Sequence, residues 1–353
     1  MKFNRYIFSE LATIKYGKNQ KKVLSENGSI PIYGTGGLMG YATTALYDKP
    51  SVLIGRKGTI GKVKFVEHPF WTVDTLFYTI VNTDIVIPKY LYYVMSLIDL
   101  NNYNEGTTIP SLRTETLNRL EFNIPSLEKQ ELILSCLNPI DEKIGINNSI
   151  NNNLEQQADA LYQTFFSPKS GTQGKIVTLD EYCSIFTGKK NANASVNGGK
   201  YKFFTCAPEA LQIDSYIFDG NAIIVSGNGA YTGRTRFYSG KFDLYQRTYA
   251  CTLLDNVNPD FIFPLYWFVK LELSKKIMGG TRGSAIPYIV MNDLAKFEFI
   301  YNEEMFANYT PLFKSLTEAI QANEFESENL AQIRDSLLSK LMSGELDVSN
   351  IDI

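Results

Sequence analysis

The stretch ILSCLNPIDEKIGINNSINNNLEQQADALYQTFF, residues 133–166, decides the fold, because its apolar residues recur at alternating spacings of four and three. That spacing keeps one stripe on one face of an α-helix, where a partner helix can cover it. The same spacing recurs 176 residues further along the chain. The two stripes, called seams below, are Ile133, Leu137, Ile140, Ile144, Asn147, Asn151, Leu154, Ala158, Leu161 and Phe165, and Tyr309, Phe313, Leu316, Ile320, Asn323, Ser327, Leu330, Arg334, Leu337 and Leu341.

A helix along the first seam would be about 50 Å long, and its stripe would lie in water unless another helix covered it. We predict that the two seam helices cover each other in an antiparallel coiled coil, with Asn147 opposite Ser327 and Asn151 opposite Asn323. Such a polar layer would fix the register. The alternative is that the asparagines only mark a weak, frayed helix centre. Arg334 at its seam position is expected to extend into solvent.

The segments that precede the two helices also share an order of landmarks, which indicates a repeated module. Each segment is predicted to contain short strands, turns rich in Gly and Asn, and apolar helices that begin near Pro88 and Pro264. The matching landmarks are Gly17-Lys18 with Gly188-Lys189, the run 51–62 with the run 222–234, and Ile109-Pro110 with Ile286-Pro287.

The sequence therefore predicts an α+β protein with internal pseudo-twofold symmetry. Two similar mixed α/β domains are expected at residues 1–125 and 172–302. Two long helices, at residues 126–168 and 303–348, are expected to separate the domains and to pack as an antiparallel coiled coil.

Charge divides along the same boundaries. The net charge is −3, but residues 1–124 hold 14 Lys and Arg against 10 Asp and Glu, and residues 171–302 hold 14 against 11. Residues 125–170 hold 3 basic against 6 acidic side chains, and residues 303–353 hold 3 against 10. A moderately positive module can meet phosphates if its Lys and Arg cluster on one face, whereas acidic helices suit a protein partner better.

Chemistry for catalysis is sparse. The four cysteines are far apart without CxxC spacing, and His68 is the single histidine, so neither a zinc site nor a disulfide framework is expected. The glycines at 34–37 and 55–61 fail the dinucleotide and phosphate-loop patterns and are interpreted as turns. We expect no catalytic residue, no metal and no cofactor. With no apolar run of membrane length and no leader, a cytoplasmic protein is expected.

Four stretches carry a resemblance to a known family: GRKGTIGKV (55–63), TTIPSLRTETLNRLEFNIPSLEKQELI (107–133), LEQQADALYQTFF (154–166) and IRDSLLSKLMSGELDV (333–348). With these stretches the chain resembles the specificity subunit of type I restriction–modification systems, and with the two-copy layout the resemblance covers nearly the whole sequence. In the second copy Ser226-Gly227-Asn228-Gly229 replaces the Gly-Arg-Lys-Gly turn, so contact residues transfer less well to it.

The resemblance implies two target-recognition domains, each reading one half of a split site in double-stranded DNA. It also implies helices that set the spacing and dock methyltransferase (modification) subunits, two of them being expected, and an endonuclease/translocase (restriction) subunit in the full complex. Candidate DNA-binding side chains, chosen because Lys, Arg, Asn, Thr and Tyr bind phosphates and base edges, are Lys18, Lys21, Lys22, Arg56, Lys57, Thr59, Lys62, Lys64, Lys189, Lys190, Asn191, Asn228, Tyr231, Arg234, Arg236, Arg247 and Arg282.

Two other functions stay open at this point. The chain could be an interaction scaffold, or a degenerate allele that assembles partners without reading DNA. It could also be a ligand-binding enzyme that uses its Gly-rich turns. Neither the bases recognised nor the spacer length follows from the sequence.

Overall fold

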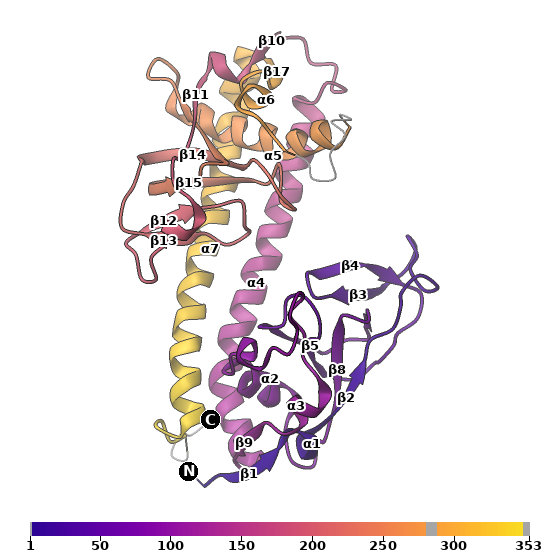
Figure 1. The fold of residues 1–353 in the computed structure, drawn as a ribbon. Helices are drawn as coiled ribbons and strands as arrows, with labels where there is room; N and C mark the ends of the chain where they lie inside the picture. Colours follow the sequence, from indigo (N-terminus) through magenta and orange to yellow (C-terminus); the bar gives the residue numbers. More distant parts are fainter. Residues whose placement is uncertain (1, 280–287, 349–353) are drawn as a thin grey trace. The chain divides into compact units, whose positions relative to one another are not determined.

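The structure, a computed structural model, describes residues 2–279 and 288–348, and the chain divides into two compact units (Figure 1). Unit 1 comprises Met1–Gly145 and Ser327–Ile353, and unit 2 comprises Ile146–Glu326. The long helix α4 (Leu127–Phe165) runs from unit 1 into unit 2, and the long helix α7 (Glu303–Ser343) returns from unit 2 to unit 1. Each unit therefore contains one globular module and a stretch of each long helix.

The module of unit 1 is a mixed α/β fold. Its elements are β1 (Asn4–Ile7), α1 (Phe8–Leu11), β2 (Ala12–Tyr16), β3 (Ile30–Gly34), β4 (Gly37–Ala42), β5 (Ser51–Gly55), β6 (Val63–Val66), β7 (Trp71–Thr72), β8 (Leu76–Val81), α2 (Pro88–Ser96), η1 (Leu100–Tyr103), α3 (Thr114–Asn118) and β9 (Glu121–Ile124). An antiparallel sheet has the order β2-β8-β5-β6. A second sheet, β4-β3-β7, contains the parallel pair β3 and β7, and β1 pairs with β9.

The module of unit 2 repeats this plan. Its elements are β10 (Lys175–Thr178), η2 (Leu179–Glu181), β11 (Cys183–Thr187), η3 (Ala192–Ala194), β12 (Tyr201–Phe204), β13 (Leu211–Ile213), β14 (Phe218–Ser226), β15 (Thr235–Leu244), β16 (Thr248–Leu253), η4 (Pro259–Phe261), α5 (Ile262–Gly279), α6 (Met291–Ala295) and β17 (Glu298–Tyr301). The run β11-β16-β14-β15 corresponds to β2-β8-β5-β6, and β10 pairs with β17 as β1 does with β9. The long strand β15 also corresponds to β7 at its carboxyl end, where it pairs in parallel with β12 as β7 does with β3.

The central strands of both modules are apolar along their length because both faces of the sheet are covered. In unit 1, Val52 and Ile54 face the core beneath α2, whereas Leu53 belongs to a separate apolar cluster on the other face. In unit 2, Ile223 faces the main core and Ile224 the opposite cluster. A continuous apolar run is the expected pattern for a strand buried on two sides. The predicted strands and the two apolar helices, α2 and α5, are thus confirmed.

The long helices complete the core of each unit. In unit 1, Leu137 of α4 and Leu341 of α7 are buried with the residues of the module, and in unit 2 Tyr162 and Phe313 are buried in the same way. The fully buried Gln130 fixes the start of α4 to the module, since its side chain accepts a hydrogen bond from the backbone of Ile87 and donates to two backbone carbonyls.

The ends of α7 follow from local sequence. Asn302 accepts a hydrogen bond from the backbone N–H of Met305 through its side-chain oxygen, and two glutamates in the first turn suit the positive end of the helix dipole. The helix ends at Ser343, and Gly344 adopts a positive φ of 78°. That left-handed conformation favours glycine and ends a helix.

The seam prediction is confirmed in both units. Every seam residue of α4 and α7 is buried or half-buried, whereas the intervening positions are largely exposed. The two helices run antiparallel within each unit (Figure 1). In unit 2, Asn147 of α4 meets Glu326 of α7, whereas Asn151, later in α4, meets Asn323, earlier in α7.

The polar layer lies within unit 2. The side-chain amide of Asn323 donates to Asn151 at 2.8 Å, which is the predicted pairing. Asn147, fully buried, donates to the carboxylate of Glu326 at 2.8 Å. The predicted position of Asn147 opposite Ser327 remains a prediction. Since α4 is continuous through these asparagines, the alternative of a frayed helix centre is wrong.

The expectation for Arg334 is also wrong. Its guanidinium does not extend freely into solvent but pairs with Asp141 of α4 at 3.1 Å, and its side chain is 24% exposed. The same carboxylate accepts a hydrogen bond from the hydroxyl of Tyr93 and lies 3.3 Å from the ammonium of Lys89, both on α2. Asp141 therefore joins α2, α4 and α7, and this four-residue group is called the Asp141 cluster below.

No helix within residues 2–279 and 288–348 combines the length and apolar character that a membrane span requires.

Candidate nucleic-acid interface

The basic turn of unit 1, residues 55–61, follows the central strand β5 and is fixed by a distant segment. The backbone N–H of Gly58 donates to the carbonyl of Pro110 at 2.9 Å, and Lys57 forms a β-bridge with Ser111. The N–H of Leu112 donates to the carbonyl of Arg56 at 2.9 Å. The turn, which the sequence predicted, is thereby fixed to the rest of the module rather than left as a free loop.

The corresponding turn of unit 2 is fixed in the same way. Asn228 forms a β-bridge with Tyr288, and the N–H of Ile289 donates to the carbonyl of Gly227 at 2.8 Å. Gly58 and Gly229 have the same positive φ of 84°, which side chains disfavour. The two turns therefore keep one backbone design although their side chains differ.

A second loop follows the edge strand of each sheet and begins with a glycine that cannot be replaced. A Cβ on Gly17 would lie 2.0 Å from the carbonyl oxygen of Val73, and one on Gly188 would lie 1.7 Å from that of Leu244. The repeated Gly-Lys pair thus marks a close backbone contact, and the lysine that follows is directed out at the end of the strand.

The two loops of unit 1 meet at the segment 72–75. Lys18 donates through its backbone N–H to Thr72 at 2.8 Å, and Arg56 donates through its backbone N–H to Thr75 at 2.8 Å. The guanidinium of Arg56 also donates to the carbonyl of Asp74 at 2.9 Å. The loops that bear Lys18, Arg56 and Lys57 consequently lie together at one end of the strands, where β2 and β5 both finish.

Unit 2 repeats this arrangement at residues 244–248. Gln246 donates to the carbonyl of Lys190 at 3.0 Å, and Gly227 donates to the carbonyl of Arg247 at 2.9 Å. The N–H of Ser226 donates to the carbonyl of Arg234 at 2.9 Å. The loops that carry the candidate residues of the second module are therefore joined at one end of the strands as well.

Three of the candidate arginines also contact aromatic rings. The guanidinium of Arg56 lies 5.0 Å from the ring centre of Tyr16, and that of Arg234 lies 5.8 Å from the ring centre of Tyr231. Arg236 lies 5.6 Å from the ring centre of Phe204 and donates to the carbonyl of Ala207. Burial, with a smaller effect of Arg234, lowers the pKa of Arg236 to about 10, so it keeps its charge at neutral pH.

Two candidate lysines are held by their own module. The ammonium of Lys190 lies 2.7 Å from the carboxylate of Asp243, whose side chain is 5% exposed. The ammonium of Lys64 lies 3.9 Å from the ring centre of Tyr33, and burial lowers its pKa. Both contacts position the lysine side chain, and Lys190 also fixes the second loop of unit 2.

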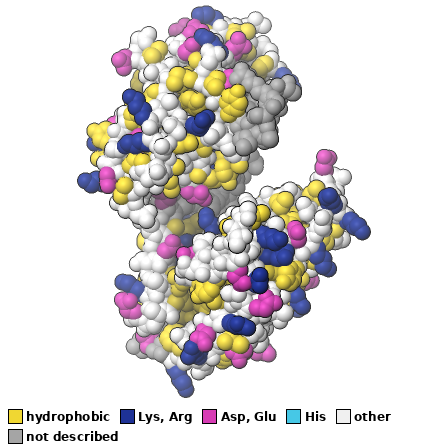
Figure 2. Space-filling view, in the orientation of Figure 1, with side chains coloured by type: hydrophobic (Ala, Val, Ile, Leu, Met, Phe, Trp, Pro, Cys, Tyr) yellow, Lys and Arg dark blue, Asp and Glu magenta, His cyan; other side chains and the backbone are white. Residues whose placement is uncertain are grey.

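The remaining described candidates lie at the surface, with Asn228 half-buried. Figure 2 shows Lys and Arg side chains, interspersed with Asp and Glu, over the part of unit 1 that holds β3, β5 and β8. Arg282 lies outside the described residues. The exposed candidates are Lys18, Lys21, Lys22, Lys57, Thr59, Lys62, Lys189, Asn191, Tyr231, Arg234 and Arg247.

Some residues of the interface were missed by the sequence reasoning. Trp71 donates its indole N–H to the carbonyl of Lys18 at 2.8 Å, and Asp243 holds Lys190. The exposed loop 104–112 lies directly beside the basic turn. Its signal was present, since the stretch that begins at Thr107 is one of the four that carry the family resemblance.

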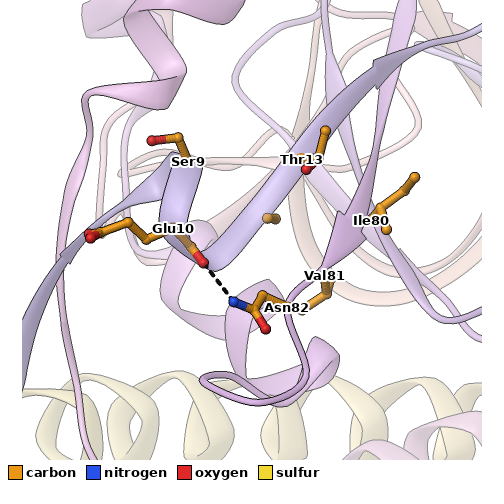
Figure 3. Close-up of a pocket in the computed structure, with 7 residues that line it drawn as sticks. Ser9, Glu10, Thr13, Ile80, Val81 and Asn82 are labelled. Atoms are coloured by element: carbon orange, nitrogen blue, oxygen red, sulfur yellow. Dashed lines mark hydrogen bonds between the residues drawn. The ribbon is translucent and has the colours of Figure 1, made fainter.

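The hollows of the modules offer little chemistry. One hollow in unit 1, between α1, β2 and β8, contains Glu10 and Asn82, and the amide of Asn82 donates to the backbone carbonyl of Glu10 at 3.2 Å (Figure 3). The buried thiol of Cys183 has its pKa raised to about 12 by desolvation. Among the residues that the structure describes, no group of three or more His, Cys, Asp or Glu is placed to hold a metal ion.

The family model for the type I restriction modification DNA specificity domain matches residues 3–156 and again residues 173–301. The chain belongs to this specificity-domain family. The doubled match agrees with the repeated strand order of the two modules and confirms the resemblance inferred from the sequence.

Relatives within the specificity-domain family include specificity subunits. The chain is 35% identical over 177 residues to the type I restriction enzyme EcoDI specificity subunit of Escherichia coli, a match that covers 49% of this chain and 38% of that protein. It is 23% identical over 346 residues to the MjaIX specificity subunit of Methanocaldococcus jannaschii, covering 87% of this chain and 80% of that protein.

A solved structure shares the fold. The crystal structure of a type I restriction–modification S subunit from M. genitalium matches with a TM-score of 0.58 at 16% sequence identity, covering 97% of this chain and 96% of that chain. At this level of identity the match establishes the fold of a specificity subunit.

Proposed function

We propose that the chain is the non-catalytic, sequence-specific DNA-binding subunit of a type I restriction–modification complex. Each module reads one half of a bipartite site in double-stranded DNA, and α4 and α7 set the distance between the halves. The observation that carries the proposal is that one chain holds two modules with the same strand order, each with a glycine turn and a Gly-Lys loop joined at one end of the strands.

In this proposal residues 1–125 and 172–302 are the target-recognition domains, and residues 126–168 and 303–348 are the spacer helices. Half-site spacing follows protein geometry in DNA-binding proteins with two reading elements. A coiled coil whose register is fixed by a polar layer is a suitable spacer, because a slip of the helices would change the distance between the recognised bases.

The candidate side chains divide into two roles. Exposed lysines such as Lys18, Lys57 and Lys189 bind phosphates and set the position of the DNA. The arginines held over aromatic rings, Arg56 and Arg234, are pre-oriented, so that less side-chain entropy is lost when they bind a base edge or a phosphate.

The partners follow from the family resemblance, and the charge distribution agrees with them. The helical segments 125–170 and 303–353 carry the acidic excess, which disfavours DNA and suits the docking of methyltransferase subunits, two per chain. An endonuclease/translocase subunit completes the assembly. Since the DNA and these partners are intracellular, the complex would work in the cytoplasm.

A methylation map tests the proposal. The chain would be expressed with a cognate methyltransferase in a host without other methylation, and modified adenines would be located by single-molecule sequencing. We expect one split sequence with a constant gap. If methylation follows no discrete split sequence, the proposal is wrong.

A module exchange separates DNA reading from scaffolding. Replacing residues 1–125 by the module of a relative should change one half of the methylated sequence and leave the other half and the gap unchanged. An interaction scaffold that does not read DNA would give the same methylated sequence before and after the exchange.

A single lysine tests the interface itself. Lys57→Gln should weaken DNA binding of the assembled complex for all sequences and lower the slope of log affinity against log salt by about one, because one phosphate contact is lost. Lys169→Gln, at an exposed position after α4, is the matched control and should leave the slope unchanged. Equal slopes for the two variants would remove Lys57 from the interface.

A further inference from the structure

The loop 104–112 of unit 1 presents an apolar side chain to solvent. Ile109 is 60% exposed, and its neighbours Thr107, Thr108 and Pro110 are also exposed. A large aliphatic side chain at a loop tip gains nothing for folding from such a position, since apolar groups stabilise a fold when they leave water. The exposed side chain is therefore available for contact with a binding partner.

The loop is held rigidly, which makes the exposure a fixed feature. The side-chain oxygen of Asn104 accepts hydrogen bonds from the N–H groups of Gly106 and Ser111, both at 2.9 Å. The N–H of Glu105 donates to the carbonyl of Ser111 at 2.9 Å. A Cβ on Gly106 would lie 1.9 Å from the carbonyl oxygen of Ile109, so the chain is tightly folded there.

An exposed lysine lies on the turn beside this apolar tip. The carbonyl of Pro110 accepts from Gly58 at 2.9 Å, and Ser111 bridges to Lys57, so the tip lies beside the exposed basic turn. A polyanion that contacts Lys57 would therefore bring its neighbouring groups against Ile109. In duplex DNA those groups include base edges as well as sugars, and the one large apolar group on a base edge in the major groove is the C5-methyl of thymine.

We propose that Ile109 is a specificity-determining residue that contacts the C5-methyl group of a thymine in the half-site read by the first module. This inference rests on the proposed function and adds a base contact to it. Arg56 and Lys57 hold the backbone of the DNA, and the fixed loop places the isoleucine at the groove.

Replacing thymine by uracil tests the contact without changing the protein. The half-site of the first module, once mapped, would be synthesised with deoxyuridine at one thymine position at a time. Binding by the chain assembled with its methyltransferase subunits would then be measured. We expect one position at which loss of the methyl group weakens binding about fourfold, the effect of exposing one methyl-sized group.

The variant Ile109→Ala should lose this sensitivity and bind thymine and uracil sites equally. Ile80→Ala, at a partly exposed isoleucine on β8, is the matched control and should keep the fourfold difference. Ile109→Val, which keeps a branched side chain, should show an intermediate difference.

Three outcomes would overturn the inference. Either no thymine position responds to uracil in the unaltered protein, or Ile109→Ala keeps the full response. A third outcome, in which Ile109→Ala loses the methyltransferase subunits but keeps the thymine response, would assign the loop to a protein partner and also overturn it. Failure of the proposed function is distinct, because no split sequence would then be found to synthesise.

Discussion

The Asp141 cluster offers a sharp test of how the first module is attached to the long helices. The substitution Asp141→Ala removes the acceptor for the hydroxyl of Tyr93 and the partners of Arg334 at 3.1 Å and Lys89 at 3.3 Å. Asp141 and Arg334 have side chains only 22% and 24% exposed, so water replaces the lost partner incompletely.

The magnitude follows from that partial burial. Removing one partner of a fully buried ion pair costs about 3–5 kcal/mol, and leaving a buried donor unpaired costs about 1–3 kcal/mol. For this cluster we expect Asp141→Ala to destabilise unit 1 by about 2 kcal/mol. Arg334→Met, which leaves Asp141 its contacts with α2, should cost about 1 kcal/mol, and the double variant should cost less than the sum of the two.

Hydrogen exchange followed by mass spectrometry measures this effect in each unit separately. A loss of about 2 kcal/mol accelerates the exchange of protected amides about 30-fold. Peptides from α2 should show this acceleration, whereas peptides from α5 in unit 2 serve as the internal reference. Asp335→Ala is the matched control, because Asp335 also pairs with Arg334 but is 63% exposed, and it should change exchange little.

The reasoning is refuted if Asp141→Ala leaves the exchange of α2 unchanged, or if Asp335→Ala has an equal effect. Acceleration of the same size in α5 would also refute it, because the cluster belongs to unit 1.

Three other variants have defined outcomes. Gly188→Ala should destabilise unit 2 by more than about 2 kcal/mol, measured by urea unfolding, because its Cβ would lie 1.7 Å from a backbone carbonyl oxygen. Replacing Asn151 and Asn323 together by Leu should raise the melting temperature and broaden the set of gaps in the methylation map, because an apolar layer specifies register less well. Hydrogen bonds from Lys296 and then from Thr178 lower the pKa of Asp180 below its ordinary value of 3.8. A lowered carboxyl pKa stabilises the fold above the unfolded value, so the stability lost in Asp180→Asn should be present at pH 6 and vanish as the pH falls through the folded pKa.

Each of these has an opposing result. Normal stability of Gly188→Ala would mean that the loop can move away. The reference is Gly36→Ala in unit 1, at a position where nothing lies near the Cβ and where φ is not in the left-handed region. A single gap in the Asn151 and Asn323 variant would remove the polar layer as the register device. A stability difference for Asp180→Asn that is constant from pH 6 to pH 2 would exclude the linkage.

The repeated helices and turns were predictable because they depend on the spacing of apolar residues and glycines close together in the sequence. An alternation of four and three defines the seam, and a glycine after an apolar β-branched run defines the turn after β5 and that after β14. The antiparallel alignment of the two seams predicted that Asn151 lies opposite Asn323, and the hydrogen bond between their side chains confirms it.

The ion-pair partners of single charged side chains could not be predicted from this spacing. Arg334 was expected to extend into solvent because no residue of its own helix was predicted to bind it. The carboxylate that binds it belongs to Asp141 on the facing helix, one residue after the seam position Ile140. Lys190 and Asp243 are likewise 53 residues apart in the chain and meet only in the folded sheet. Periodicity describes which face of an element is buried, whereas ion pairs depend on the partner element.

The interface was predictable only in part for a related reason. Residue type singled out the basic turns, but the segment that fixes each of them lies 52 residues later in the first module, at Pro110, and 60 residues later in the second, at Tyr288. Ile109 entered the sequence analysis only as part of a repeated Ile-Pro landmark. Its exposure depends on hydrogen bonds that the side chain of Asn104 accepts, and these cannot be read from the sequence.

The division of α7 between the units has a consequence for synthesis on the ribosome. Unit 2 is one continuous segment, whereas the core of unit 1 includes Leu338, Leu341 and Val348 from near the end of the chain. The module of unit 1 is translated before unit 2, but its core is complete only after α7 has been synthesised. We expect the nascent chain to finish its second half before its first, and the module of unit 1 to be the one that chaperones hold.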